Sequence, residues 1–137
     1  MNATESLSRI VSLKEDALLS SSVQLDLFFS ESRRLALANG FIFSYRENQS
    51  PGTSELSAVE VLRFVKDGLS PQPRSNVLSL VSTYGSGKSH LALTLATFFG
   101  LSSSSPEVNS ILNTLASIGP ALKSEFESYK ALSPKPH

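Results

Sequence analysis

The feature that most constrains the fold of this chain is a glycine-containing turn. It separates two segments whose apolar residues repeat with different periods. Residues 77–81 are apolar except for Ser79, which predicts a mostly apolar strand. Beyond the turn, Leu91, Leu95 and Phe98 follow one another at the spacing of a helix face. The chain therefore predicts a strand, a tight turn and a helix, in that order. The turn contains Gly85, Ser86, Gly87, Lys88 and Ser89.

This turn matches most of the phosphate-binding (Walker A) pattern G-x-x-x-x-G-K-[ST], although Ser82 stands where the first glycine is expected. Glycines allow backbone conformations in which successive N–H groups point at one anion. The helix that follows directs its unpaired N–H groups and the positive end of its dipole to the same place. We therefore expect a nucleotide-binding loop made by Thr83, Tyr84, Gly85, Ser86, Gly87, Lys88, Ser89 and His90.

Three of these side chains have separate expected roles. Lys88 is expected to reach the β- and γ-phosphate oxygens, and the Ser89 hydroxyl is expected to be a ligand of Mg²⁺. For His90, a contact with a phosphate and a contact with a backbone carbonyl are both open. The chain has no N-K-x-D segment that would read guanine, so the expected cofactors are ATP and Mg²⁺. The alternative is an ordinary turn, but the helix dipole disfavours a lone lysine in a first turn.

The acid that hydrolysis requires has no obvious candidate. Enzymes of this class place an acid at the end of a second apolar strand, and none of Glu107, Glu125 and Glu127 does so. Asp26 fits a solvent-facing strand position better than a magnesium site, and residues 33–34 fit a solvated helix face better than an arginine finger. We therefore assign no catalytic residue. We expect an N-terminal fragment of a longer ATPase, inactive by itself.

The expected fold class is α/β: a partial three-layer P-loop NTPase fold that lacks its later core strands. Residues 1–73 form an N-terminal α/β region, with a strand expected at 41–45 and a helix capped by Ser54. Residues 23–29 alternate as a strand would, and a helix that runs on through Leu37 and ends at Asn39 and Gly40 is the alternative. Residues 74–101 supply the strand, loop and helix of the core. Residues 102–137 form a helical segment, with one helix starting at Pro106 and a second after Gly119.

Charge and composition exclude several classes of protein. The chain has 137 residues, and its 12 Lys and Arg balance 12 Asp and Glu, so it lacks the basic excess of a stand-alone nucleic-acid binder. It has no cysteine, which excludes disulfides and thiolate zinc sites. The N-terminus does not look like a secretory signal, and the longest apolar stretch is too short to span a bilayer. We therefore expect a soluble, cytoplasmic protein without membrane contact.

The residues on either side of the central part of the loop resemble those of a known protein family. With Tyr84 before Gly85 and His90 after Ser89, the loop is similar to that of the large prokaryotic ATPases of phage defence, the BREX-type ATPases, which read approximately G-x-[FY]-G-[ST]-G-K-[ST]-H. The resemblance covers about residues 77–99. It implies that Lys88 and Ser89 hold a triphosphate and Mg²⁺.

For the intact protein, the resemblance implies ATP-dependent steps of anti-phage defence with protein partners. DNA is a further candidate partner, through regions outside this chain. Two other functions remain open at this point. One is a non-catalytic interaction or regulatory domain with a degenerate loop, and the other is a module of a DNA-translocating motor.

Overall fold

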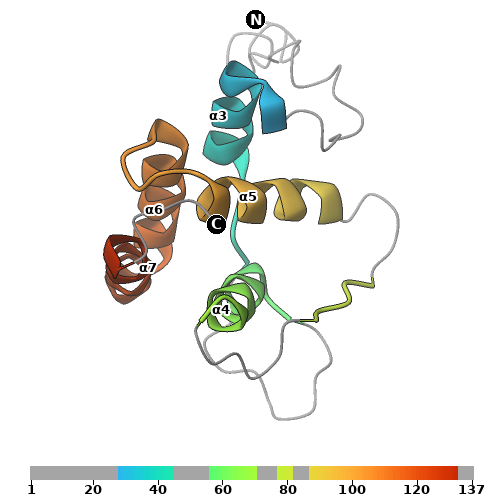
Figure 1. Ribbon diagram of the computed structural model, residues 1–137, viewed down its shortest axis with the longest axis vertical. Helices are drawn as coiled ribbons and strands as arrows, with labels where there is room; N and C mark the ends of the chain where they lie inside the picture. The colour runs from blue at the N-terminus through green and yellow to red at the C-terminus, as the bar shows by residue number, and fades with distance from the viewer. Residues whose placement is uncertain (1–27, 45–55, 71–76, 82–86, 133–137) are drawn as a thin grey trace, which may run out of the picture.

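The computed structural model describes residues 28–44, 56–70, 77–81 and 87–132. Figure 1 shows α5 running across the middle of the molecule, with α3 on one side of it and α4 on the other. Helices α6 and α7 lie side by side at the C-terminal end of α5. The described residues form five helices: α3 (Glu31–Gly40), α4 (Ala58–Gly68), α5 (Lys88–Gly100), α6 (Pro106–Ile118) and α7 (Pro120–Leu132).

The predicted α/β fold is wrong: the described residues contain helices and no strand. Residues 77–81 make no ladder there, and Val77 and Val81 are 78% and 91% exposed. Phe41 and Phe43 are buried against the helices instead of lying in a sheet. Of the predicted strand 23–29, residues 23–27 lie outside the described residues, and Phe28 and Phe29 form a 3₁₀ turn. A strand needs a neighbouring strand for its backbone N–H and C=O groups, so an apolar sequence alone does not make one.

The hydrophobic core is built from apolar faces of all five helices. Phe98 of α5 packs edge-on against Phe126 of α7, with ring centroids 5.7 Å apart. Both side chains are fully buried, as is Leu62 of α4. Full burial of a large apolar side chain contributes about 1.5–3 kcal/mol each. The core therefore fixes α5 between α4, α6 and α7. The other buried members of this core are Ala38, Phe41, Phe43, Ala58, Val59, Phe99, Val108, Ile111, Leu112, Leu115 and Leu122.

Helices α4 and α6 begin with side-chain caps. Ser57 accepts a hydrogen bond from the Glu60 N–H, and the Glu60 carboxylate accepts one from the Ser57 N–H at 2.7 Å, which makes a capping box. The predicted cap at Ser54 is therefore wrong by three positions, because Glu60 pairs with Ser57. At α6, Ser105 accepts from the Val108 N–H and Pro106 takes the first helical position, as the sequence predicts.

Ion pairs connect described helices that are distant in sequence at two places. Arg34 of α3 donates to Glu107 of α6 at 2.8 Å and to the Phe28 carbonyl at 2.6 Å. The prediction of a solvated face is therefore wrong for Arg34, whose side chain is 14% exposed against 1% for Glu107, and holds for the exposed Arg33. At the second place, Arg63 and Lys66 of α4 both donate to Glu125 of α7 and so form two ion pairs.

The described helices are short. None combines the length and the apolar character that a membrane crossing requires.

Candidate functional site

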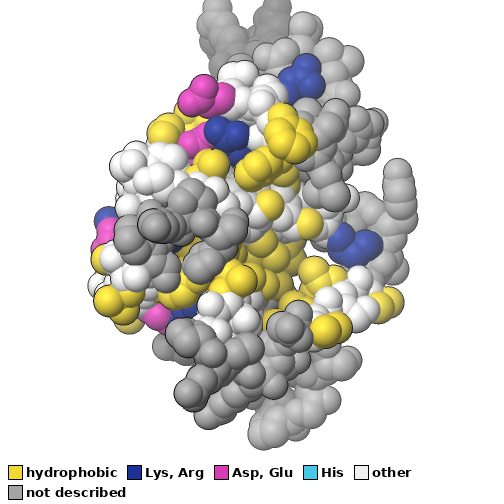
Figure 2. Space-filling view, in the orientation of Figure 1, with side chains coloured by type: hydrophobic (Ala, Val, Ile, Leu, Met, Phe, Trp, Pro, Cys, Tyr) yellow, Lys and Arg dark blue, Asp and Glu magenta, His cyan; other side chains and the backbone are white. Residues whose placement is uncertain are grey.

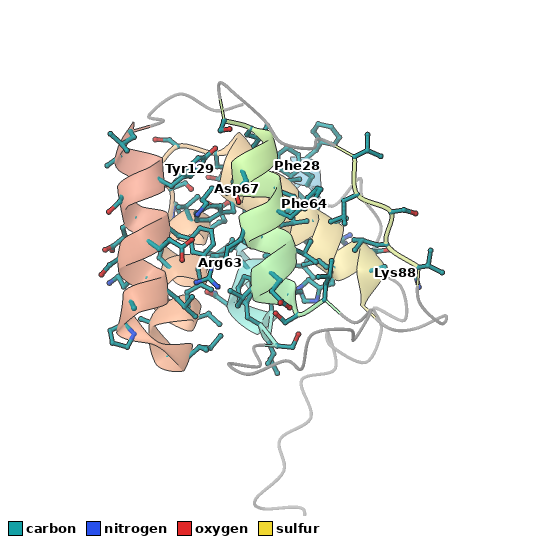
Figure 3. The ribbon with its side chains drawn as sticks, turned by 90° about the horizontal axis from the view of Figure 1, so that it is seen from below. Phe28, Arg63, Phe64, Asp67, Lys88 and Tyr129 are labelled. Atoms are coloured by element: carbon teal, nitrogen blue, oxygen red, sulfur yellow. The ribbon has the colours of Figure 1, made fainter. Side chains whose placement is uncertain are left out.

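The predicted nucleotide loop is described only in its second half. Residues 82–86, which include the predicted Thr83, Tyr84, Gly85 and Ser86, lie outside the described residues. The structure places the remaining four residues together: Gly87 is the N-cap of α5, and Lys88, Ser89 and His90 form its first turn. Figure 3 shows Lys88 at the end of α5 that is remote from α7.

Gly87 has the left-handed backbone conformation, with φ of 83°. It is the one residue with positive φ in the described part of the chain. A Cβ atom at Gly87 would have no neighbour within 4 Å, so the glycine is required by the backbone and not by lack of space. For other residues this conformation costs about 1–2 kcal/mol. The sequence places a glycine where the entry into α5 needs one.

Within the described residues, the first turn of α5 has a glycine as its N-cap and no capping side chain. It contains no acidic residue. The first N–H groups of any α-helix have no partner inside the helix, and together with the dipole they favour an anion. Lys88 adds a positive charge in this turn with a half-buried side chain, and Ser89 adds an exposed hydroxyl. The turn therefore presents N–H groups, a cation and a hydroxyl, which are the groups that bind phosphate.

The His90 ring faces α3. Its Nε2 atom lies 2.9 Å from the carbonyl oxygen of Leu37, in the last turn of α3. The ring also packs edge-on against Phe41, with centroids 4.9 Å apart and planes at 81°. Carbonyls in the last turn of a helix have no partner inside the helix, so His90 satisfies one of them. The structure contains the carbonyl contact, one of the two contacts that the sequence leaves open for His90, and the phosphate contact stays a prediction.

The other end of α5 is held by a residue that sequence reasoning missed. Lys130 of α7 is 3% exposed and donates from Nζ to the Leu101 carbonyl at 2.7 Å. Its Nζ also lies 5.3 Å from the centre of the Phe98 ring. Burial lowers the pKa of Lys130 below the ordinary lysine value, because it disfavours the charged form. No local signal could have found this contact, since a lysine on an amphipathic helix normally reads as solvent-facing.

The described residues contain no group of three or more His, Asp or Glu side chains that could hold a metal ion. The donor set at the first turn of α5 is a single hydroxyl, from Ser89. Mg²⁺ in nucleotide sites is held largely by phosphate oxygens and water, with few protein ligands. Ser89 therefore fits Mg²⁺ brought by a triphosphate and does not fit a metal held by the protein alone.

A second surface feature is a shallow groove between α3 and α6. Every side chain that lines it is uncharged, so it lacks the cation that a phosphate needs. We therefore place the candidate site at the first turn of α5. The groove residues are Asn39, Pro106, Asn109, Ser110, Asn113, Thr114 and Ser117.

Comparison with known proteins adds no relative, since no protein-family model, curated protein or solved structure matches this chain.

Proposed function

We propose that this chain binds ATP with Mg²⁺ through residues 83–90, as part of a larger ATPase. The observation that supports this most is the left-handed Gly87 immediately before Lys88 and Ser89 at the start of a helix. The proposal rests on this local geometry and on the loop sequence, and not on a sheet.

The electrostatics of the turn support an anionic ligand. A cation in the first turn of a helix opposes the dipole, which disfavours it by about 0.3–1 kcal/mol. A bound triphosphate reverses this, because its negative charge interacts favourably with the dipole, with the N–H groups and with Lys88. In this arrangement Lys88 holds the terminal phosphates and Ser89 contributes one oxygen to Mg²⁺.

The wider role is proposed from the resemblance of the loop to that of the BREX-type ATPases. The intact protein then uses ATP in anti-phage defence with protein partners, and contacts with DNA come from regions outside this chain. We expect no turnover by the chain alone, because no residue in it is assigned as the acid or base of hydrolysis.

A second candidate is an interaction or regulatory domain whose loop does not bind nucleotide. The observation that favours it is the helical core, because the described residues lack the parallel sheet on which hydrolysing enzymes of this class build their site. The two candidates differ in one measurable property, which is the affinity for ATP.

Isothermal titration of the folded chain with ATP and Mg²⁺ tests the proposal. We expect binding by the wild type and a loss of at least about tenfold in affinity for Lys88→Ala, since a hydrogen bond to a charged group contributes about 1.5–3 kcal/mol. Lys123→Ala is the matched control: it removes the same charge from α7, where Lys123 pairs with Glu127 at 3.4 Å. Absence of binding by the folded wild type contradicts the proposal and favours the second candidate.

A further inference from the structure

Both ends of α5 are joined to other helices by a side chain that donates to a carbonyl oxygen. At the start, His90 of α5 reaches the Leu37 carbonyl of α3. At the end, Lys130 of α7 reaches the Leu101 carbonyl that follows α5. The first contact lies inside the candidate site, whereas the second lies a whole helix away. A variant that breaks only the second contact therefore shows the effect of lost stability on ligand binding, because it leaves the candidate site unchanged.

His90 is close to the proposed phosphate groups in sequence but points elsewhere. Successive residues of a helix advance by about 100° around its axis, so the side chain of His90 lies roughly 200° from that of Lys88. Its ring is half-buried, and its contacts are Leu37 and the edge-on ring of Phe41. The side of α5 that carries His90 therefore holds the turn in place, while Lys88 lies on the opposite side.

The chemistry of the bond fixes the position of one proton. A carbonyl oxygen only accepts, so Nε2 of His90 carries the hydrogen and donates it to Leu37. This is true of the neutral ring and of the imidazolium ion. A glutamine side chain places an amide donor at a similar distance from the backbone, so it is able to replace this function of His90, whereas alanine is not.

We infer that His90 is a positioning residue that holds the first turn of α5 against the last turn of α3. It aligns the N–H groups of that turn with the phosphates of the ligand. The inference rests on the proposed function for its effect on binding. It gives the His90 side chain a role that needs no contact with the nucleotide, and it assigns to α3 the role of a support for the site.

The binding test uses inorganic triphosphate with Mg²⁺ and the full chain. We expect His90→Ala to weaken triphosphate binding roughly five- to tenfold, the effect of one net hydrogen bond, and His90→Gln to stay within about twofold of the wild type. Lys130→Met is the control, because it breaks the contact at the far end of α5. It is expected to lower the melting temperature and leave the affinity for triphosphate within about twofold.

Hydrogen exchange and NMR of the ligand-free protein report on the same first turn of α5. The Leu91 N–H donates to the Gly87 carbonyl at 2.9 Å and so reports on the first turn of α5. We expect faster hydrogen exchange at Leu91 in His90→Ala, and wild-type exchange at Leu91 in both His90→Gln and Lys130→Met. The ¹⁵N signals of the His90 ring should show a protonated Nε2.

The outcomes separate the inference from the proposed function. If Lys88→Ala loses triphosphate binding but His90→Ala binds as the wild type does, the positioning inference is overturned. If His90→Gln is as weak as His90→Ala, the hydrogen bond is not the cause and the inference is also overturned. If the wild type binds no triphosphate, the proposed function fails. The positioning role is then decided by Leu91 exchange, where a rise in His90→Ala alone supports it and an unchanged rate overturns it.

Discussion

Helices α5 and α6 begin in opposite ways, although both are 13 residues long and pack against each other. The start of α6 is completed inside the protein: Ser105 caps it, and the acidic Glu107 in its first turn pairs with Arg34. The start of α5 has a glycine N-cap in the left-handed conformation, a lysine in place of an acid and, among the described residues, no side-chain cap. The first turn of α6 therefore serves the fold, and the proposed function assigns the first turn of α5 to an anion from outside.

The largest expected effect concerns the start of α6, where Glu107 is paired with Arg34. Arg34→Met leaves the Glu107 carboxylate buried without its partner, so we expect a loss of about 3–5 kcal/mol in the free energy of unfolding, measured by urea denaturation. Arg33→Met is the control, because Arg33 is exposed, and we expect a change within about 0.5 kcal/mol. A loss below about 1 kcal/mol in Arg34→Met would show that the fold does not depend on this pair.

A smaller effect is expected at the entry into α5. Gly87→Ala places a Cβ atom on a left-handed residue and should lower the free energy of unfolding by about 1–2 kcal/mol. Gly40→Ala is the matched control, since Gly40 lies in α3 without positive φ and with open space around its Cβ position. That substitution should be neutral or stabilise by up to about 1 kcal/mol. Equal effects at the two glycines would contradict the role given to the conformation of Gly87.

Ser89→Asp makes α5 begin more like α6. A carboxylate in the first turn interacts favourably with the helix dipole, so we expect a gain of about 0.3–1 kcal/mol in stability in thermal unfolding at low salt. The same charge repels a triphosphate, and ATP binding should be lost. Ser89→Asn, which adds no charge, is the control and should keep the stability of the wild type. If Ser89→Asp is more stable than the wild type and binds ATP with unchanged affinity, the anion-binding role proposed for the start of α5 is contradicted.

The smallest expected effect concerns the capping box of α4. Hydrogen bonds from the Ser57 backbone and then from its hydroxyl hold the pKa of Glu60 below the ordinary value, burial opposes them weakly, and the Arg63 charge adds to the lowering. Because the folded pKa is lowered, the stabilisation is complete above the ordinary glutamate pKa and is lost as the pH falls through the lowered value. Melting temperatures of the wild type and Glu60→Gln should therefore differ at pH 7 and converge in acid. A constant difference would contradict this account.

The sequence predicted helices better than it predicted the fold class. The apolar spacing of Ile111 and Leu115 in α6, and of Leu122 and Phe126 in α7, marks faces that are indeed buried. A helix makes its backbone hydrogen bonds within itself, so a local pattern is enough to predict it. The same reasoning was wrong for residues 77–81, because a strand depends on a partner that no local pattern reveals.

The candidate site, like the fold, was predicted only in its local features. The identity and spacing of Gly87, Lys88 and Ser89 are local, and the sequence predicted that a glycine turn would open a helix here. The orientation of His90 was left open, since it depends on Leu37 and Phe41, which lie about fifty positions earlier in the chain. On the face that Figure 2 shows, the basic and acidic side chains of the described residues are scattered between apolar ones and form no single charged patch that would point to the site.

The sequence by itself determined that α4, α5, α6 and α7 are helical and that α5 begins with a glycine, a lysine and a serine. These properties follow from backbone conformation and from bonds between residues four positions apart or fewer. Only the tertiary structure decided that the described core is helical, that Arg34 is paired with Glu107, and that His90 and Lys130 hold the two ends of α5. Each of these depends on burial and on partners brought together from distant parts of the chain, where a charge or a donor that looks solvent-facing in the sequence is forced to find a bond.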